Sequence, residues 1–511
     1  MKTLVRGKYV ITDAAARETG IIEDGAVLVE GKYVRATGRF AELRQLHPEA
    51  AVVGDGQQLV LPGLIDAHSH GRGLSPLQKG VPNDFLENNL FDWAFMPVLD
   101  PELITALCAV RHIRNGSTLI HNNAFDTTGS GAADQAATTI KAYLATGIRL
   151  AYSPGVRNID RLVLDTDGFL ATLPAELRAV AEPLARTDSK LIEEEYFALF
   201  TELYRTYQSE DTRIFLSPSW AQACTAEFLI RAKAEADRLG KIPIHMHCLQ
   251  TPVQKAFSLR KYGKTAIAYL ADLGLLDENT VLAHSIWVTQ EDIRLMAEHN
   301  VAVTSHPSCN LGMRNGITPV YELLRQGIRV AVGMDDKTIN DDEDIIMELR
   351  MMHKLHRVPG YRLDTPALDA FTVLEMATGH AASMVGFAGK TGALRPGLLA
   401  DLIVVDLDRM LNSPWMSDQT GIADIFIHRA LGTDVASVMI GGHLVMEDRK
   451  ITTLDEEALY REVRKAADKG ITPAMRRQAE TLQQLKPYCQ SWYNAWLEPE
   501  QHAFYQVNSR R

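Results

Sequence analysis

The feature that most constrains the fold is a series of eight short apolar runs between residues 61 and 335, separated by segments with helical periodicity. Most of these runs are apolar at nearly every position, which is typical of parallel strands buried on both faces. Strands that alternate with helices eight times predict an α/β fold, the (β/α)8 barrel of the TIM type. The runs are Leu61–Ala67, Ser117–His121, Arg149–Ser153, Arg213–Ser217, Ile242–His247, Thr280–His284, Val301–His306 and Arg329–Asp335.

The segments between the runs predict helices, for example over residues 101–115, 223–240 and 290–299. Two intervals, residues 71–99 and 156–212, are much longer than the usual connection between a strand and a helix. We expect these two intervals to form loops or inserted helices over the mouth of the barrel.

Both ends of the chain lack this alternation and contain short strands separated by turns. Residues 1–60 together with 386–452 therefore predict a small β-sandwich domain formed by both chain ends. Residues 61–385 form the predicted barrel, and residues 453–511 form a helical C-terminal extension.

The extension has two features of its own. Thr453 and Glu456 have the spacing of a capping box at the start of a helix. Four aromatic side chains, which we expect to pack on the core or on a partner subunit, follow later in the extension: Tyr488, Trp492, Tyr493 and Trp496.

Composition narrows the classes of partner. The chain has 53 Lys and Arg against 64 Asp and Glu, a net charge of −11, which argues against nucleic acid or an anionic membrane as the main partner. An apolar run of about 18 residues, as a membrane span needs, does not occur, and the first residues do not resemble a signal peptide. The five cysteines are widely spaced and include no CxxC pair, so neither a disulfide framework nor a thiolate zinc site is expected. We therefore expect a cytoplasmic protein that acts on a small molecule.

Histidines and an aspartate stand at the ends of the predicted strands. His68 and His70 follow the first run directly, and residues two apart on a strand point to the same side, so both imidazoles can bind one metal ion. Active sites of these barrels are built from the C-terminal ends of several strands. Further groups of this kind end the fifth to eighth runs, which predicts one shared site: His245, His247, His284, His306 and Asp335.

Several motifs together resemble the amidohydrolase superfamily, closest to its branch of triazine chlorohydrolases, S-adenosylhomocysteine deaminases and guanine deaminases. The resemblance covers roughly residues 1–450. It is carried by LPGLIDAHSH at 61–70, GST at 116–118, GIRL at 147–150, HMH at 245–247, VLAH at 281–284, SHPSCN at 305–310 with NG at 315–316, GMD at 333–335 and GALRPGLLAD at 392–401.

The resemblance implies a role for each of five residues. His68, His70, His247 and Asp335 correspond to metal ligands, and Asp335 also to the proton shuttle. His284 corresponds to the histidine that polarises the substrate and holds the attacking water. Three imidazoles and one carboxylate suit one Zn²⁺ ion per chain, with Fe²⁺ as the alternative. Such a metal lowers the pKa of its bound water and supplies hydroxide.

Two departures from the superfamily bear on the reaction. Members with two metals use a carboxylated lysine after the fourth strand, whereas residues 213–220 contain no lysine, so a single metal is expected. The deaminases place a glutamate three residues after the third ligand, to protonate a ring nitrogen, and here that position is Gln250. A glutamine can form hydrogen bonds but cannot transfer a proton.

We therefore expect a metal-dependent amidohydrolase that hydrolyses the C–N bond of an amide, urea or carbamate-like group, with Gln250 at the reacting group. The alternative is a deaminase or dechlorinase of an amino- or chloro-substituted heteroaromatic ring (triazine, purine, pterin or pyrimidine) with another acid in place of the glutamate. A metal-free binding protein on the same fold is a second alternative. Family habit and the aromatic tail suggest a homo-dimer or homo-tetramer.

Other residues near the strand ends are candidates for secondary roles. Asp336 and the acidic residues 341–344 are expected to solvate a loop and favour the start of a helix. Cys248 and Cys309 are expected to be small apolar fillers. Candidate substrate contacts are Trp93, Trp220, His245, Trp287, His306, Asn310 and Arg314.

Overall fold

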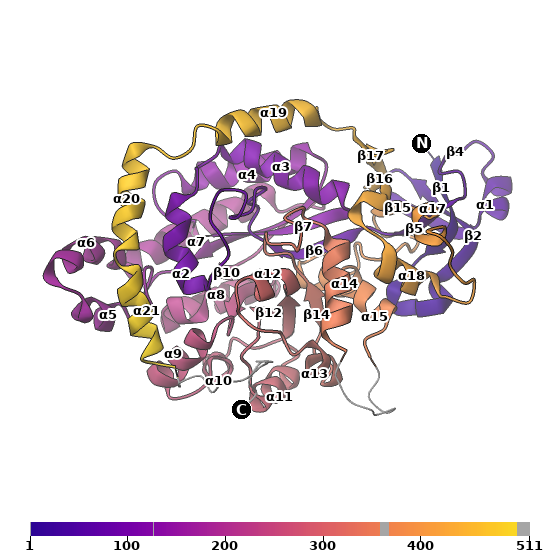
Figure 1. The fold of residues 1–511 in the computed structure, drawn as a ribbon. Helices are drawn as coiled ribbons and strands as arrows, with labels where there is room; N and C mark the ends of the chain where they lie inside the picture. The colour runs from indigo at the N-terminus through magenta and orange to yellow at the C-terminus, as the bar shows by residue number, and fades with distance from the viewer. Residues whose placement is uncertain (1, 126, 358–366, 498–511) are drawn as a thin grey trace.

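The computed structural model describes residues 2–125, 127–357 and 367–497 (Figure 1). All eight predicted runs contain strands, the fourth being split in two, and within each sheet neighbouring strands run parallel, so the fold is mixed α/β. One sheet contains β6 (Leu64–Ser69), β7 (Ser117–Ala124), β8 (Arg149–Val156), β9 (Thr212–Ile214) and β10 (Ser217–Pro218), and the other contains β11 (Ile244–Cys248), β12 (Thr280–His284), β13 (Ala302–Ser305) and β14 (Val330–Val332).

The two parallel sheets are linked at both edges. Parallel bridges join Leu216 to Ile244 and Trp220 to His247, so β10 lies beside β11. At the opposite edge the carbonyl of His68 accepts the backbone N–H of Asp335 at 2.9 Å. These contacts bring the carboxyl ends of strands that are distant in sequence to one place.

Helices surround the strands, and the three predicted above are all present. Their first turns are capped by side chains that satisfy free backbone N–H groups, as Thr225 does for α8 and Thr289 for α11. The helices of this part of the chain are α3 (Pro101–Arg114), α4 (Ala132–Ala145), α7 (Ser189–Tyr207), α8 (Ala226–Arg238), α9 (Pro252–Tyr262), α10 (Ala266–Asp272), α11 (Gln290–Glu298), α12 (Pro307–Gly312), α13 (Val320–Arg325), α14 (Ile345–Leu355), α15 (Ala370–Glu375) and α16 (Gly379–Met384).

The two long intervals contain inserted helices, as expected. The first holds α2 (Leu86–Asp92) and the short 3-10 helix η2 (Trp93–Phe95), and the second holds α5 (Thr166–Thr172) and α6 (Ala175–Ala185) before α7. Another 3-10 helix, η3 (Ala221–Ala223), follows β10.

Strands from both chain ends join in one sheet, because β15 pairs antiparallel with β5. Hydrogen bonds connect all nine strands described here into a single sheet, and the two-layered sandwich stays a prediction. The strands are β1 (Lys2–Ile11), β2 (Ile21–Glu30), β3 (Tyr33–Arg39), β4 (Ala51–Val53), β5 (Gln58–Pro62), β15 (Leu402–Asp406), β16 (Val435–Ile440), β17 (His443–Glu447) and β18 (Lys450–Ile451), and the helices beside them are η1 (Ala14–Gly20), α1 (Phe40–Leu46), α17 (Asp408–Leu411), α18 (Ile422–Arg429) and η4 (Gly432–Asp434).

The C-terminal extension forms α19 (Glu456–Ala467), α20 (Pro473–Gln483) and α21 (Lys486–Asn494), drawn in yellow in Figure 1. The cap of α19 is Asp455, which accepts the N–H of Ala458 at 2.9 Å, so the predicted capping box was wrong.

Helices α20 and α21 pack on the inserted segments of the same chain. The ammonium of Lys486 lies 2.8 Å from the carboxylate of Asp92, and the Trp492 indole donates to the carbonyl of Leu164 at 3.2 Å. The four aromatic residues of the tail join the apolar cluster formed there. The aromatic tail is therefore explained by packing within one chain and gives no support to an oligomer.

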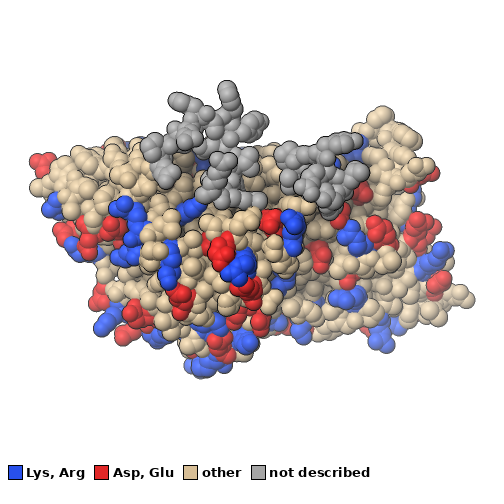
Figure 2. Space-filling view, turned by 90° about the horizontal axis from the view of Figure 1, so that it is seen from below, with Lys and Arg blue, Asp and Glu red and all other residues tan. Residues whose placement is uncertain are grey.

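The charge on the surface and the hydropathy of the helices agree with the composition of the sequence. Figure 2 shows acidic and basic side chains interspersed over one face of the molecule. Within the described part of the chain, every helix is too short or too polar to cross a membrane.

Candidate metal centre and reaction pocket

Four side chains predicted as ligands meet where β6, β11 and β14 end. The ligand nitrogens of His68, His70 and His247 lie within 4.8 Å of one another. The Asp335 carboxylate lies 3.0 Å from His70 Nε2 and 3.6 Å from His68 Nε2. Gly333 permits this approach, because a Cβ there would lie 2.7 Å from the Cβ of His68.

Hydrogen bonds on the far side of each ring leave Nε2 free to bind a metal. His70 Nδ1 donates to the carbonyl of Asn123 and His247 Nδ1 to that of Ser219, both at 2.7 Å, so the neutral form of each ring offers the lone pair of Nε2 to a metal. His68 Nδ1 lies 2.8 Å from His245 Nε2, and its own Nε2 is buried without a hydrogen-bond partner among the described residues. An unpaired buried nitrogen beside two such rings fits a divalent metal.

The protonation states suit metal binding. Burial lowers the pKa of His68 and His247 well below the ordinary value for histidine, so both rings are neutral at pH 7. Burial opposes ionisation of Asp335, but its contacts with His68 and His70 outweigh that effect and hold its pKa well below the usual range. Neutral imidazoles and an ionised carboxylate are the forms that ligate Zn²⁺.

His284, at the end of β12, stands beside this cluster. Its Nδ1 lies 2.9 Å from the side-chain oxygen of Asn310, and its Nε2 lies 3.8 Å from the Asp335 carboxylate. Burial lowers the pKa of His284 to about 4, so the ring is neutral. His284 Nε2 is buried and has no hydrogen-bond partner in the described part of the chain, and it can accept a hydrogen bond from a water.

The backbone around the site adopts a conformation that residues other than glycine rarely take. Leu249, His284, Ser285, Asp335 and Asp336 all have positive φ, between 48° and 69°. Such conformations are held only where the surrounding structure enforces them, and they concentrate at functional sites. Three strand ends are thus turned sharply toward the cluster.

Asp336 does not solvate the loop, which corrects the sequence interpretation. Its carboxylate is buried and accepts the hydroxyl of Ser69 and the backbone N–H groups of His70, Gly71 and Arg72, the last three at 3.0–3.2 Å. It thereby holds the segment that carries two of the candidate ligands. By contrast, Asp344 does cap α14, as expected for the acidic run.

Replacing Asp336 by Asn is expected to weaken zinc binding about tenfold to a hundredfold, because an amide NH2 would face backbone donors and the His70 segment would lose its fixed position. Competition with a chelating dye measures the Zn²⁺ dissociation constant, and circular dichroism verifies folding. Asp341→Asn, in the same loop on a partly exposed side chain, serves as the control. Unchanged zinc affinity in folded Asp336→Asn would contradict this role.

A pocket opens beside the cluster and encloses about 280 Å³, part of it open to solvent. It includes Gln250 and both Trp93 and Trp220, three of the predicted site residues. Arg72 and Lys337 add two cations that the sequence interpretation missed, although each lies two residues from a predicted ligand. The lining consists of His70, Arg72, Leu86, Trp93, Phe125, Trp220, His247, Gln250, Met313, Asp335 and Lys337.

The remaining predicted substrate contacts lie elsewhere. The Trp287 indole donates to the carbonyl of Asn315 at 2.8 Å, and the exposed Arg314 guanidinium lies 4.1 Å over the ring of Phe85. Asn310 supports His284 from behind. His245 lies behind His68, and His306 Nδ1 lies 3.1 Å from His284 Nδ1.

The sequence profile of the amidohydrolase family matches residues 59–445, and that of a bacterial imidazolonepropionase-like composite domain matches residues 25–50. The chain is 28% identical to a 5-methylthioadenosine/S-adenosylhomocysteine deaminase of Syntrophus aciditrophicus, over 88% of this chain and 93% of the relative. It is also 28% identical to a 5'-deoxyadenosine deaminase of Methanosarcina barkeri, over 92% of this chain and 98% of the relative.

Solved structures resemble the fold. An adenosine deaminase from Xanthomonas campestris with bound zinc superposes with a TM-score of 0.75 at 25% identity, over 91% of this chain and 98% of that one. The atrazine chlorohydrolase of Arthrobacter aurescens TC1, complexed with zinc, superposes with a TM-score of 0.75 at 22% identity, over 91% of this chain and 100% of that one.

Proposed function

This chain belongs to the amidohydrolase family and is a hydrolase acting on carbon–nitrogen bonds other than peptide bonds, and we propose that it cleaves the C–N bond of an amide, urea or carbamate group in a small molecule. The observation that carries the proposal is the acid content of the reaction pocket. Asp335 is the one carboxyl group among its described lining residues, and Gln250 occupies the position at which the resemblance places a glutamic acid. Attack on a carbonyl carbon requires no acid at a ring nitrogen, so one carboxylate suffices.

His68, His70, His247 and Asp335 would hold the metal, which we propose to be a single Zn²⁺ ion, with Fe²⁺ as the alternative. When bound, such a metal lowers the pKa of a water and polarises the carbonyl of the substrate. Neighbouring zinc-bound structures of the same fold support this assignment.

Three polar side chains of the site have defined roles in this proposal. His284 Nε2 accepts a hydrogen bond from the attacking water and orients it. Asp335 takes the proton from the water and passes it to the leaving nitrogen, which departs as an amine or ammonia. Arg72 Nη1 is buried without a hydrogen-bond partner among the described residues, and it can donate to an oxygen of the substrate.

Deamination of a heteroaromatic ring is the second candidate, because the curated relatives named above deaminate adenosine-type nucleosides. That reaction would need a proton donor other than Gln250 for the ring nitrogen. Dechlorination of a ring would need the same donor.

A substrate panel separates these functions. The metal-loaded enzyme is incubated with substituted ureas, carbamates, simple amides, 5'-deoxyadenosine, aminotriazines and chlorotriazines, and the release of ammonia, amine and chloride is measured. We expect turnover to be confined to ureas, carbamates and amides. Turnover of the ring compounds alone would overturn the proposal in favour of the second candidate.

Replacing Gln250 by Glu is expected to shift selectivity toward amino-heteroaromatic compounds by at least about tenfold in kcat/KM relative to ureas, since it supplies a proton donor beside the metal ligands. Gln135→Glu, on the exposed face of α4, is the matched control, because it makes the same change of side chain outside both the reaction pocket and its neighbouring pocket. Unchanged relative rates across the panel would refute this explanation of Gln250.

The sequence also suggested a closed barrel, a cellular location and an assembly for this chain, and we propose each of them here. We propose that the two parallel sheets are halves of a closed (β/α)8 barrel. The bridges beside β10 and β11 support closure at one edge, and the hydrogen bond from the backbone N–H of Asp335, just after β14, to the carbonyl of His68 supports it at the other. A cytoplasmic location is supported by five buried free cysteines, which persist in a reducing compartment. A homo-dimer or homo-tetramer is proposed from family habit alone.

A further inference from the structure

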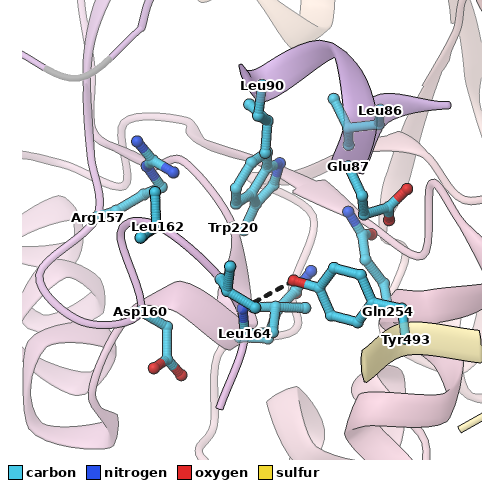
Figure 3. A pocket seen from close by; sticks show the side chains of 12 residues that line it. Leu86, Glu87, Leu90, Arg157, Asp160, Leu162, Leu164, Trp220, Gln254 and Tyr493 are labelled. Atoms are coloured by element: carbon cyan, nitrogen blue, oxygen red, sulfur yellow. Dashed lines mark hydrogen bonds between the residues drawn. The ribbon is translucent and has the colours of Figure 1, made fainter. Parts of the chain in front are cut away.

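A second pocket lies next to the reaction pocket and encloses about 330 Å³, part of it open to solvent (Figure 3). The two pockets share Leu86 and Trp220 as walls. The lining combines six apolar side chains with six that carry polar groups: Leu86, Leu90, Leu162, Val163, Leu164 and Trp220, of which Trp220 also has an indole N–H, together with Glu87, Arg157, Asp160, Gln222, Gln254 and Tyr493.

The C-terminal helix α21 completes this second pocket. The hydroxyl of Tyr493 accepts the backbone N–H of Leu164 at 2.9 Å, shown by the dashed line in Figure 3. The neighbouring Trp492 donates to the carbonyl of Leu164 at 3.2 Å. One wall of the pocket is thus built from the end of the chain and fixed to the insertion after β8.

Two buried hydrogen-bond donors in the lining lack partners within the described part of the chain. They are Nε2 of Gln222, whose side chain belongs to a residue that is 2% exposed, and Nε1 of Trp220, in a residue that is 6% exposed. Burying a hydrogen-bond donor without a partner destabilises the folded protein, because the donor loses its hydrogen bond to water and gains none in return. Both donors indicate an acceptor atom that the described residues do not supply.

The charges in the lining select among acceptors. Glu87 and Asp160 contribute two carboxyl groups against the one guanidinium of Arg157, which lies 5.2 Å from the centre of the Trp220 ring. Glu87 also accepts the hydroxyl of Thr251. A carboxylate ligand would meet like charges here, whereas an uncharged carbonyl or ether oxygen would not.

A hydrogen bond also connects the two pockets. The side-chain oxygen of Gln254, in the second pocket, accepts the backbone N–H of Gln250, in the reaction pocket, at 2.8 Å. One molecule that occupies both pockets would therefore touch both ends of this hydrogen bond.

We propose that the second pocket binds the part of the substrate distant from the scissile bond, namely an uncharged apolar arm that carries a carbonyl or ether oxygen. Gln222 and Trp220 donate to that oxygen, and the leucines and the Tyr493 ring contact the arm. The inference rests on the proposed function only in treating the ligand as part of a substrate.

The test uses three probes of similar length: hexanamide, hexanoate and hexylammonium. The full chain is produced with 5-fluorotryptophan in place of tryptophan. The ¹⁹F resonance of Trp220 is identified by its absence in Trp220→Phe and is followed during each titration. We expect hexanamide to shift this resonance with a dissociation constant at least about fivefold lower than the other two probes. In Gln222→Met, which has nearly the same shape without the donor, hexanamide should bind about threefold to tenfold more weakly. Gln135→Met, on the exposed face of α4, is the matched control.

The results for binding and the results for hydrolysis test the inference and the proposed function separately. Three results would each overturn the inference. Hexanamide could leave the Trp220 resonance unshifted, it could bind equally well to folded Gln222→Met, or it could bind no better than hexanoate. Ammonia and amine release from the ureas and carbamates of the substrate panel is measured in parallel. Binding that depends on Gln222 without any hydrolysis would count against the proposed function and leave the second pocket as a binding site, while hydrolysis without such binding would do the reverse.

Discussion

Replacing Asp335 by Asn is expected to lower kcat/KM at least about a hundredfold while the fold stays intact. The carboxylate lies 3.0 Å from His70 Nε2 and 3.8 Å from His284 Nε2, which is compatible with both proposed roles, metal ligand and carrier of the proton of the water. An amide ligates poorly and cannot carry that proton. Asparagine has the same shape and tolerates the positive φ of 52° at this position, so the backbone need not change.

Three measurements check this expectation. Steady-state kinetics on the best substrate of the panel gives kcat/KM, plasma mass spectrometry gives metal per chain, and thermal unfolding reports stability. Asp341→Asn is the control for a change of charge in the same loop. Near-full activity in Asp335→Asn would exclude both roles assigned to this carboxylate.

Removal of the metal is expected to reduce hydrolysis to the background rate, and one equivalent of Zn²⁺ per chain should restore it. Among the residues that line the reaction pocket, the one lysine is Lys337, which follows β14 rather than the fourth strand, so the structure offers no lysine where two-metal members carry one. Activity is measured after dialysis against a chelator and during stepwise addition of Zn²⁺ or Fe²⁺.

A matched pair of variants isolates the site. His247→Ala should lose the metal and the activity, whereas His443→Ala, an exposed histidine on β17, should retain both. Full restoration only at two equivalents would show that the single-metal assignment is wrong. Activity that survives complete removal of metal would refute the metal-dependent reaction itself.

The grouping of the candidate ligands was accessible from sequence because it depends on topology. Parallel strands end at the same edge, so His68, His247 and Asp335 meet even though up to 267 positions separate them. Nothing about side-chain direction beyond strand alternation is needed for that conclusion. The family profile over residues 59–445 confirms the membership that these motifs implied.

Loop residues were predicted less well, because the direction of a loop side chain depends on what packs against it. Trp287 and Arg314 follow strand ends, as Trp220 does, yet only Trp220 lines the reaction pocket. Trp287 is bound to the carbonyl of Asn315, and Arg314, at a φ of 56°, stacks on Phe85. The spacing of these residues along the sequence does not reveal any of these contacts.

Sequence alone determined the alternation of strands and helices, the residues at the strand ends and the replacement of an acid by Gln250, because periodicity and spacing are local properties. Tertiary structure decided the rest. It buried Asp336 under the segment that carries His70, set His245 against His68, and set Tyr493 against Leu164. These outcomes arise from contacts between residues far apart in the chain, whose partners exist only once the strands and the C-terminal helices have packed together.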